Sequence, residues 1–331
     1  MTGQINPALA IDGLMGTRYS PRADCDFLDY SSQWDDSYLD YKTGVVKALS
    51  GDTYTYDRVI WPLTSKSRTN GVVLLFASKF AATEYIVVKL CFFDTSHLES
   101  IDKSELAGII PAQLICGGRI QIMELCDYSL SDVEAAEAVL KKGLLTFAIF
   151  LASILNKLSA KNCVYGDLKL ENILTTMPTA KVPPRLVLAD IETLDGDIRQ
   201  GDRTALVGCT YPMMYSRIRV NCDSIASNVV YGFVVLLLAM WVVGTNQRRK
   251  ILFVGLAHQY LDPEYDCVPF DNKEHKYHKL VSRYAPCRPD ILTRIESKAA
   301  KTIARLENEL DTVEEKFSEM ELFFEDIKNL Y

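Results

Sequence analysis

The sequence has few of the residues that build metal centres or disulfide frameworks. Its nine cysteines are scattered without a C-x-x-C pair, and only four histidines occur in 331 residues. An odd number of unclustered cysteines is typical of reduced thiols, and it disfavours a structural zinc site or a secreted disulfide scaffold. The segment up to Pro21 also lacks the basic region and apolar run of a secretory signal. We therefore expect a cytoplasmic or nuclear protein.

A surplus of positive charge is also missing. The chain has 36 basic and 43 acidic residues, a net charge of -7, which leaves no overall positive field for a nucleic-acid backbone. We expect no nucleic-acid partner. With 48% hydrophobic residues and 331 positions, the chain is long enough for about two domains with real cores.

No apolar run is long enough for a comfortable membrane span. The longest, Val229–Gly244, has a core of about 16 residues, whereas about 20 are needed to cross the hydrocarbon layer. The run therefore predicts a helix buried on all sides in a large domain, and no membrane partner. The alternative, a membrane-anchored adaptor, depends on this run alone.

Strand patterns come first along the chain and helical patterns later, which favours an α+β fold with two lobes. Residues 1–56 are acidic and without a sustained period, so we expect an extension outside the fold. A β-rich lobe is expected over 57–126 and an α-rich lobe over 127–295. The expected strands include Gly71–Phe76, Glu84–Leu90 and Arg119–Cys126, and the expected helices are Ser96–Pro111 and Leu140–Leu158.

The last segment, 296–331, has apolar residues at alternating steps of four and three, the spacing of a heptad seam. This pattern predicts one long C-terminal helix. The seam either packs back on the second lobe or pairs with another chain as a homodimer, and the sequence leaves both alternatives open.

The stretch Val164–Leu174 carries the chemistry, with the sequence V-Y-G-D-L-K-L-E-N-I-L. It places Asp167, Lys169 and Asn172 on one loop between apolar residues. Phosphoryl transfer uses such a set: a carboxylate orients the attacking hydroxyl, a cation stabilises the transferring group, and an amide oxygen binds Mg²⁺. The stretch resembles the catalytic loop of the protein kinase superfamily, H-R-D-L-K-x-x-N.

The resemblance implies a role for each of these residues. Asp167 would be the base and Lys169 would contact the γ-phosphoryl group, while Asn172 and Asp190 would bind Mg²⁺, or Mn²⁺ as the alternative ion. Asp190 follows an apolar stretch, as the metal-binding Asp of the family's D-F-G motif does.

The same resemblance extends upstream and implies ATP as the cofactor. Lys89 ends V-V-K, which is similar to the family's V-A-I-K lysine on the α- and β-phosphates. Its helix glutamate would be Glu105, which we favour because an apolar face follows it, although Glu99 remains available.

Other stretches resemble the parts of the family that contact the nucleotide. Gly71 and Val73 fit the end of the phosphate-covering loop. Met123, Glu124 and Cys126 resemble the strand and hinge that hold adenine. The resemblance covers about Asp57–Ile295 and implies a bilobal kinase-like fold.

Several positions depart from the family pattern. The His and Arg of H-R-D are replaced by Tyr165 and Gly166, and the Phe-Gly of D-F-G by Ile191 and Glu192. Lys66 and Arg68 occupy the positions of two loop glycines. Further departures concern the scaffold: Arg288 loses its usual glutamate partner, because Thr210–Met213 lacks the Glu of A-P-E, and Ser227 stands where an Asp usually begins the central helix.

The sequence thus predicts a Ser/Thr protein kinase acting on a protein substrate, because a Lys two residues after the catalytic Asp is similar to Ser/Thr kinases. The alternative is a pseudokinase scaffold that binds partners through the acidic extension and the C-terminal helix. Such divergence around an intact catalytic set resembles the kinases of large DNA viruses, which would place the protein in a host cell.

Overall fold

The chain forms two compact units, which divide between Leu125 and Cys126. The structure is a computed structural model, and it describes residues 39–40, 45–48, 50–61, 71–78, 85–91, 113–115, 120–160, 164–165, 168–175, 186–189, 194–195, 225–245, 270, 272–273 and 275–330.

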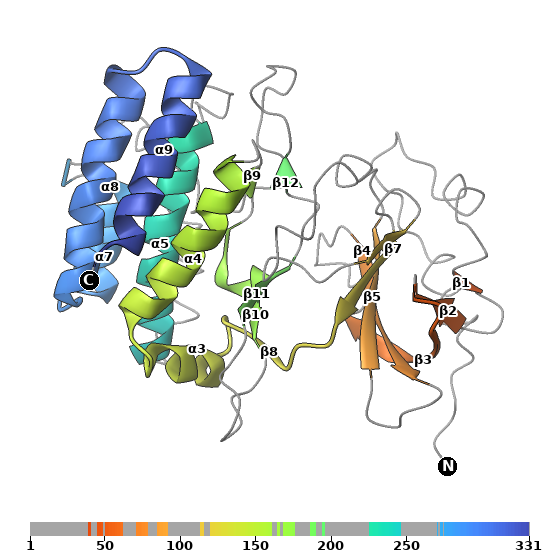
Figure 1. The fold of residues 1–331 in the computed structure, drawn as a ribbon. Helices are drawn as coiled ribbons and strands as arrows, with labels where there is room; N and C mark the ends of the chain where they lie inside the picture. The colour runs from red at the N-terminus through yellow and green to blue at the C-terminus, as the bar shows by residue number, and fades with distance from the viewer. Residues whose placement is uncertain are drawn as a thin grey trace, which may run out of the picture. The chain divides into compact units, whose positions relative to one another are not determined.

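The first unit is built on an antiparallel sheet with the order β1-β2-β3-β4-β5-β7-β6 (Figure 1). Its strands are β1 (Leu39–Asp40), β2 (Val45–Lys47), β3 (Thr53–Trp61), β4 (Gly71–Ser78), β5 (Tyr85–Cys91), β6 (Gln113–Ile115) and β7 (Ile120–Glu124). The expected strands at 71–76, 84–90 and 119–126 are confirmed as β4, β5 and β7. Buried residues lie on both faces of the sheet: Phe76, Val88 and Ile120, at 0% exposure, share one face, and Leu75 and Val87 belong to the other.

The sheet begins earlier than the sequence analysis predicts. β1, β2 and the start of β3 lie within 1–56, the range expected to be an extension outside the fold. Gly51, with φ of 94°, lies in the turn between β2 and β3, and its amide donates to the Ala48 carbonyl at 2.9 Å. The S-G-D sequence between two β-rich runs was the available hairpin signal.

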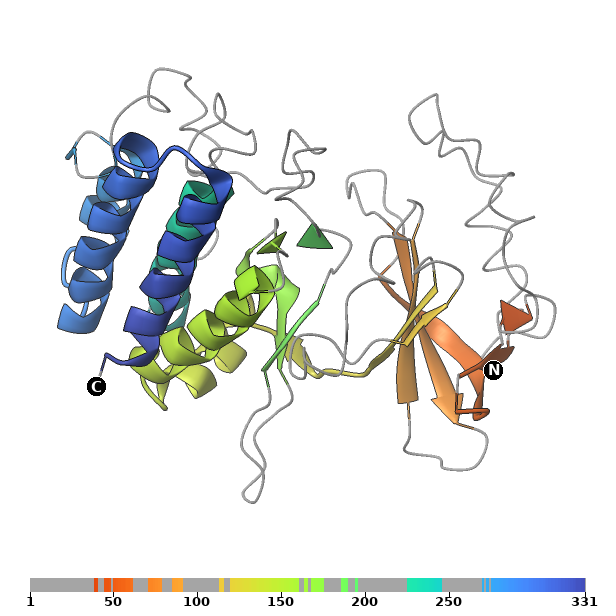
Figure 2. The ribbon, with the colours of Figure 1, turned by 45° about the horizontal axis from the view of Figure 1, so that its top comes forward.

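The second unit is mainly helical, which confirms the α+β class with a β-rich first part and an α-rich second part (Figure 2). Its helices are α3 (Val133–Leu140), α4 (Leu144–Ala160), α5 (Ile225–Thr245), α7 (Lys276–Tyr284), α8 (Asp290–Asn308) and α9 (Val313–Lys328). Its short strands are β8 (Tyr128–Ser129), β9 (Val164–Tyr165), β10 (Ile173–Thr175), β11 (Leu186–Leu188) and β12 (Leu194–Asp195), with the 3-10 turn η2 (Leu170–Asn172) before β10. The helix expected at 96–111 lies outside the described residues.

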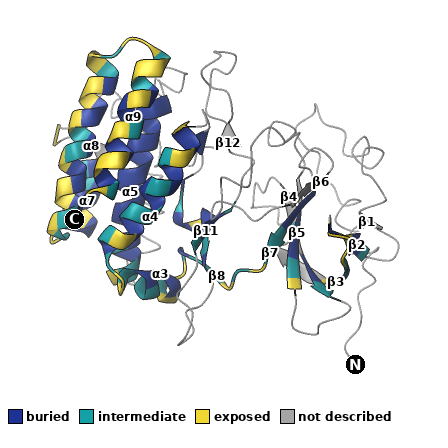
Figure 3. Cartoon of the chain, in the orientation of Figure 1, coloured by how far each residue is buried: buried dark blue, intermediate teal, exposed yellow. Residues whose placement is uncertain are grey.

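The long apolar run is α5, and it is the core of the second unit. The helix has the length and hydropathy of a membrane span, but 94% of its most apolar window is buried inside the protein. Figure 3 shows that burial extends along the helix. α3 and α4 together also have sufficient length and hydropathy, but they are bent by 99° at their junction. The expectation of a helix buried on all sides is confirmed for α5.

We predict that the full-length chain remains in the supernatant after carbonate washing of cell membranes. The reason is that the apolar surface of α5 is already covered by protein, so insertion into lipid would require the second unit to unfold. Recovery of the wild-type chain in the washed membrane fraction would contradict this prediction.

The C-terminal segment is two helices, and the prediction of one long helix is wrong. α8 ends at Asn308 and α9 begins at Val313. Thr312 caps α9 through a reciprocal capping box, in which the Glu315 amide donates to Thr312 Oγ1 at 3.2 Å and Glu315 Oε2 accepts from the Thr312 amide at 3.1 Å. A T-x-x-E signature inside the heptad pattern therefore starts a new helix.

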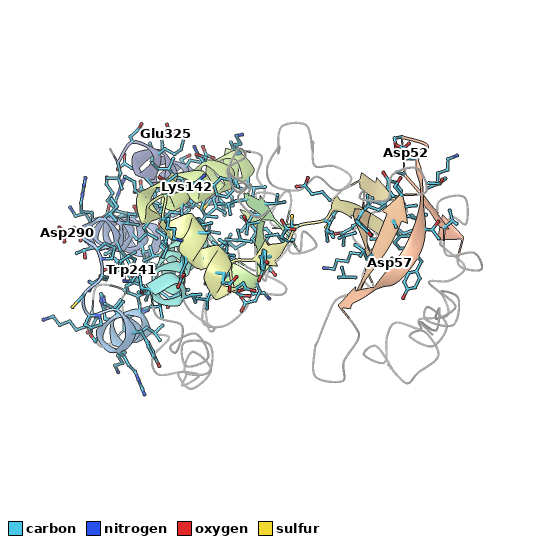
Figure 4. The ribbon with its side chains drawn as sticks, turned by 90° about the horizontal axis from the view of Figure 1, so that it is seen from below. Asp52, Asp57, Lys142, Trp241, Asp290 and Glu325 are labelled. Atoms are coloured by element: carbon cyan, nitrogen blue, oxygen red, sulfur yellow. The ribbon has the colours of Figure 1, made fainter. Side chains whose placement is uncertain are left out.

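The heptad seam is buried within the chain. Its Ile303, Leu306, Met320 and Phe324 are all at most 1% exposed. α8 packs on α5, and α9 packs on α4 (Figure 2). At one contact Asn156 of α4 donates to Glu325 of α9 at 3.1 Å, and Glu325 is labelled in Figure 4. Of the two alternatives left open by the sequence, the structure has the seam packed on its own unit.

The capping box makes the stability of α9 depend on pH. The hydrogen bonds from the Thr312 amide and hydroxyl lower the pKa of Glu315 below its ordinary value. A carboxylate with a lowered pKa stabilises the fold above its ordinary pKa, and the contribution is lost as the pH falls through the lowered value. We expect Glu315→Gln to destabilise the chain at pH 7 and to have little further effect near pH 3, as measured by urea unfolding. An equal effect at both pH values would contradict this expectation.

Candidate functional site

The sheet of the first unit collects the predicted nucleotide-binding residues on one face. Val73 of β4 lies opposite Lys89 of β5, and Val87 of β5 lies opposite Met123 of β7. Directly opposite residues of an antiparallel pair share a face of the sheet, as do residues two apart on one strand. Gly71, Val73, Lys89 and Met123 therefore belong to the same face.

Lys89 is buried, with 8% of its surface exposed. Lysine is almost never this buried unless it is paired, so a solvated charge at a sheet edge is excluded. Within the consecutive strands β3-β4-β5-β7-β6, it lies on the third to appear in the chain. Protein kinases carry their phosphate-binding lysine on the third strand.

The predicted hinge coincides with the boundary between the two units. Glu124 is the last residue of β7, and Cys126 is the first of the second unit. The next residue, Asp127, donates its amide to the Thr175 carbonyl of β10 at 3.1 Å, which ties the start of the second unit to its central hairpin. That the backbone at Glu124 and Cys126 binds adenine stays a prediction.

In the second unit, buried leucines on either side of Lys169 hold the predicted catalytic segment against the protein core. Leu168 and Leu170 are buried, and Lys169 between them is only partly so. The backbone at Lys169 is extended, with φ of -147° and ψ of 162°, so its side chain projects to the side opposite its two neighbours. η2 then turns the chain, and the Asn172 amide donates to the Lys169 carbonyl at 3.1 Å. Asn172 is 7% exposed.

The β10–β11 hairpin brings Asn172 to the residue that precedes Asp190. Ile173 lies opposite Leu188, and one step beyond this pair the Ala189 amide donates to the Asn172 carbonyl at 2.8 Å. Asn172 and Asp190 are 18 positions apart in the sequence, but the hairpin fixes the first against the immediate neighbour of the second. Asn172, one of the residues predicted to bind the metal ion, therefore lies next to Ala189, the residue before Asp190 in the sequence.

Tyr165 makes a second contact with the same residue. Its hydroxyl donates to the Ala189 carbonyl, and its ring is 3% exposed. β9, which contains Tyr165, also pairs with β12. Both backbone polar groups of Ala189 are thus bound by the segment that carries the catalytic motif, one by Asn172 and one by Tyr165. This side-chain hydrogen bond comes from Tyr165, at the position where the kinase catalytic motif has histidine.

Several predicted residues lie outside the described part of the chain. They are Asp167, Asp190 and Glu105, together with the alternative Glu99 and the departures Lys66, Arg68, Gly166, Ile191 and Glu192. Their roles stay predictions.

Comparison with solved structures finds many similar chains. The chain is similar to a solved structure described as that of vaccinia related kinase 3, with a TM-score of 0.49 and 13% sequence identity, over 97% of this chain and 96% of that chain. No protein-family model and no curated protein matches the chain. The function is therefore argued from the residues of the site.

Two carboxylates that the sequence analysis missed come from α8. Arg288 was expected to lack its usual partner, but its guanidinium binds Glu296, with Nε 2.8 Å and Nη2 2.7 Å from Oε2. Tyr277 donates to the other oxygen of Glu296 at 2.6 Å. Complete burial, followed by the charge and hydrogen bond of Glu296, raises the pKa of Tyr277 well above its ordinary value, so the phenol stays a neutral donor.

The second carboxylate is Glu307, which accepts a hydrogen bond from Ser227 at the start of α5. Ser227 stands where the family usually has Asp. α8 therefore supplies a carboxylate to both Arg288 and Ser227, the two positions at which the sequence analysis noted a departure from the kinase pattern. Only a weak indication of these contacts is present in the sequence, namely that Glu296 and Glu307 lie among the apolar residues on the buried side of a predicted helix.

We predict that Tyr165→Phe increases the Mg²⁺ concentration needed for half-maximal ATP binding. The variant loses the donor to Ala189, a contact worth about 1 kcal/mol, and thereby loosens the residue that precedes Asp190. Calorimetric titration of ATP at several Mg²⁺ concentrations measures the shift. Tyr128→Phe, on a partly exposed tyrosine of β8, is the matched control. Equal Mg²⁺ dependence in both variants would exclude this role for Tyr165.

Proposed function

We propose that the chain is an ATP-dependent protein kinase that transfers the γ-phosphoryl group to serine or threonine hydroxyls of a protein substrate. Three features support the proposal: the D-L-K-x-E-N motif, a buried lysine on the third strand of the five-strand part of the sheet, and the hairpin that fixes Asn172 beside the neighbour of Asp190. Motif and local structure agree in each case.

The observation that carries the proposal is the hydrogen bond from the Ala189 amide to the Asn172 carbonyl. A chance occurrence of the motif would not bring its asparagine next to the residue preceding a second aspartate. Oxygen ligands from an asparagine and an aspartate are suited to Mg²⁺, which prefers oxygen donors. When bound, the ion neutralises charge on the phosphate oxygens.

Each residue then has a defined task in the proposed reaction. Lys89 binds the α- and β-phosphates, and Lys169 stabilises the negative charge on the phosphoryl group during its transfer. Asp167 accepts the proton of the attacking hydroxyl. Asn172 and Asp190 hold the metal ion. Together these groups position the reactants and stabilise charge, which is most of what catalysis of phosphoryl transfer requires.

The test combines ATP binding with transfer. We expect Mg²⁺ and ATP to raise the melting temperature of the wild-type chain, because a ligand at about 100 times its Kd adds about 2.7 kcal/mol of stability. The wild-type chain should also transfer ³²P from labelled ATP to itself or to a generic Ser/Thr substrate. Lys89→Ala should lose both effects. The matched control is Lys142→Ala, on an exposed lysine labelled in Figure 4, which should retain both.

Two outcomes would contradict the proposal. ATP binding without transfer under Mg²⁺ or Mn²⁺ would favour the pseudokinase alternative. Loss of ATP binding in Lys142→Ala as well as in Lys89→Ala would mean that the observed binding is nonspecific.

A further inference from the structure

α7 begins with a buried histidine that serves as its cap. His275 is 1% exposed, and its Nδ1 accepts a hydrogen bond from the Tyr277 amide at 3.1 Å. A ring nitrogen that accepts an amide proton carries no proton itself, so the neutral ring holds its one proton on Nε2. The cap therefore exists only while Nδ1 of His275 is unprotonated.

The ring of His275 lies among aromatic rings. Its centroid is 5.6 Å from that of Tyr231 on α5 and 5.4 Å from that of Phe270. Tyr231 and Tyr277 are completely inaccessible to solvent. A charge on the imidazole would be removed from water here, and it would lie at the positive end of the α7 dipole. Both effects oppose a second proton on His275.

The charged groups near this cluster do not offset that opposition. Glu296 of α8 accepts from the Tyr277 hydroxyl at 2.6 Å, but Arg288 binds the same carboxylate at 2.7 Å and matches its charge. Glu296 is the only carboxylate among the titratable side chains around His275 in the described part of the chain. These side chains are Tyr231 on α5, Lys273 in the turn before α7, Tyr277, His278 and Lys279 on α7, and Glu296 with Arg288.

We propose that His275 is an acid-sensitive cap, and that uptake of a proton on Nδ1 breaks its hydrogen bond to the Tyr277 amide and releases the first turn of α7. Histidine ordinarily takes up a proton near about pH 6.5. The unfolded chain binds this proton, whereas the folded chain does not while the cap holds. Stability that is present above about pH 6.5 is therefore lost as the pH falls below it. The inference is independent of the proposed kinase function.

Release of the first turn also affects α8. Tyr277 is the second residue of α7, and its hydroxyl is one of the two groups that bind Glu296. When the turn opens, Glu296 keeps Arg288 and loses the buried phenol. The contact between α7 and α8 would thus respond to pH in the range in which histidine acts as a switch.

Urea unfolding of the full chain at pH 7.5 and pH 5.5 tests the inference. Between these values the ratio of folded to unfolded wild-type chain should fall about tenfold through His275, the effect of one proton that only the unfolded state binds. His275→Asn keeps an N-cap acceptor without a titrating group, so this tenfold fall should be absent from the variant. The same pH dependence in the wild-type chain and in His275→Asn would overturn the inference.

His278→Asn is the matched control. Nε2 of His278 donates to the Phe270 carbonyl at 2.7 Å, and this bond survives protonation of the other ring nitrogen, because a carbonyl oxygen only accepts. The variant should therefore keep the pH dependence of the wild-type chain. Loss of that dependence in His278→Asn, with its retention in His275→Asn, would overturn the assignment to His275.

A second measurement on the wild-type chain keeps the inference testable if His275→Asn does not fold. Hydrogen exchange of the α7 amides is measured at both pH values and corrected for the intrinsic pH dependence of exchange. Their protection should fall about tenfold at the lower pH, because the protonated histidine favours the open turn. Equal protection of α7 at the two pH values would overturn the inference.

Discussion

Asp167→Asn is expected to slow phosphoryl transfer by about 10²- to 10⁴-fold while leaving ATP binding nearly intact. A general base acts on the proton of the attacking hydroxyl in the transition state, and its removal typically costs this much in rate. The amide keeps the shape of the side chain, so binding of the nucleotide ground state should change little. Single-turnover transfer and calorimetric ATP binding, measured on the same preparation, check both parts.

Asp190→Asn should have the opposite profile. It removes a charged ligand from the metal site, so ATP binding that depends on Mg²⁺ should itself weaken. The contact between Ala189 and Asn172 involves only backbone atoms and should survive the change. Glu192 adds a second carboxylate two residues on, so the double variant Asp190→Asn with Glu192→Gln shows whether it serves as a ligand.

Equal transfer rates in the wild-type chain and Asp167→Asn would contradict the assignment of the base.

Phe324→Ala is expected to lower the free energy of unfolding by about 3–5 kcal/mol, the range for a large aromatic side chain removed from a core. Phe324 is completely buried on α9, and its ring centroid is 5.5 Å from that of Phe233 on α5 in an edge-to-face contact. Denaturant unfolding of the full chain measures the loss. Leu322→Ala on the same helix is the matched control, because Leu322 is 61% exposed and its truncation should change stability by less than about 0.5 kcal/mol.

The same variants test the internal position of the heptad seam. If α9 pairs with another chain in solution, Phe324→Ala should lower the oligomeric mass. If α9 packs on its own unit, the mass measured by light scattering should stay the same while stability falls. A fall in mass would contradict the intramolecular packing of α8 and α9 described above.

Much of the fold could be predicted from local patterns. The strand at Gly71–Phe76 follows from a short apolar run between polar turns, and the helix around Val229–Gly244 from an apolar run too long for a strand. The C-terminal segment could not be resolved in this way, because a heptad pattern continues through Leu310 and Val313 while the chain turns there. The pattern reports which face is buried, and it does not report whether the backbone is continuous.

The site was predictable to the extent that it is local. Lys169 and Asn172 belong to one short motif, so the resemblance of that motif to a kinase catalytic loop is enough to predict them. Glu307 reaches Ser227 across 80 positions, and no local pattern indicates such a contact. Tyr165 was interpreted as a departure from the family, and only the fold shows that its hydroxyl binds Ala189. Long-range partners are the part of a site that requires tertiary structure.

The packing of α8 and α9 over α4 and α5 has a consequence for how the protein is made. α5 is complete at Thr245, and α9 begins about 70 residues later. At a synthesis rate of about 5–20 residues per second, several seconds pass between the synthesis of α5 and that of α9. During this interval α5 presents a surface that chaperones bind and that aggregates when unprotected. Nascent chains released before α9 should therefore be captured by holdase chaperones, and the yield of folded protein should depend on the synthesis of α9.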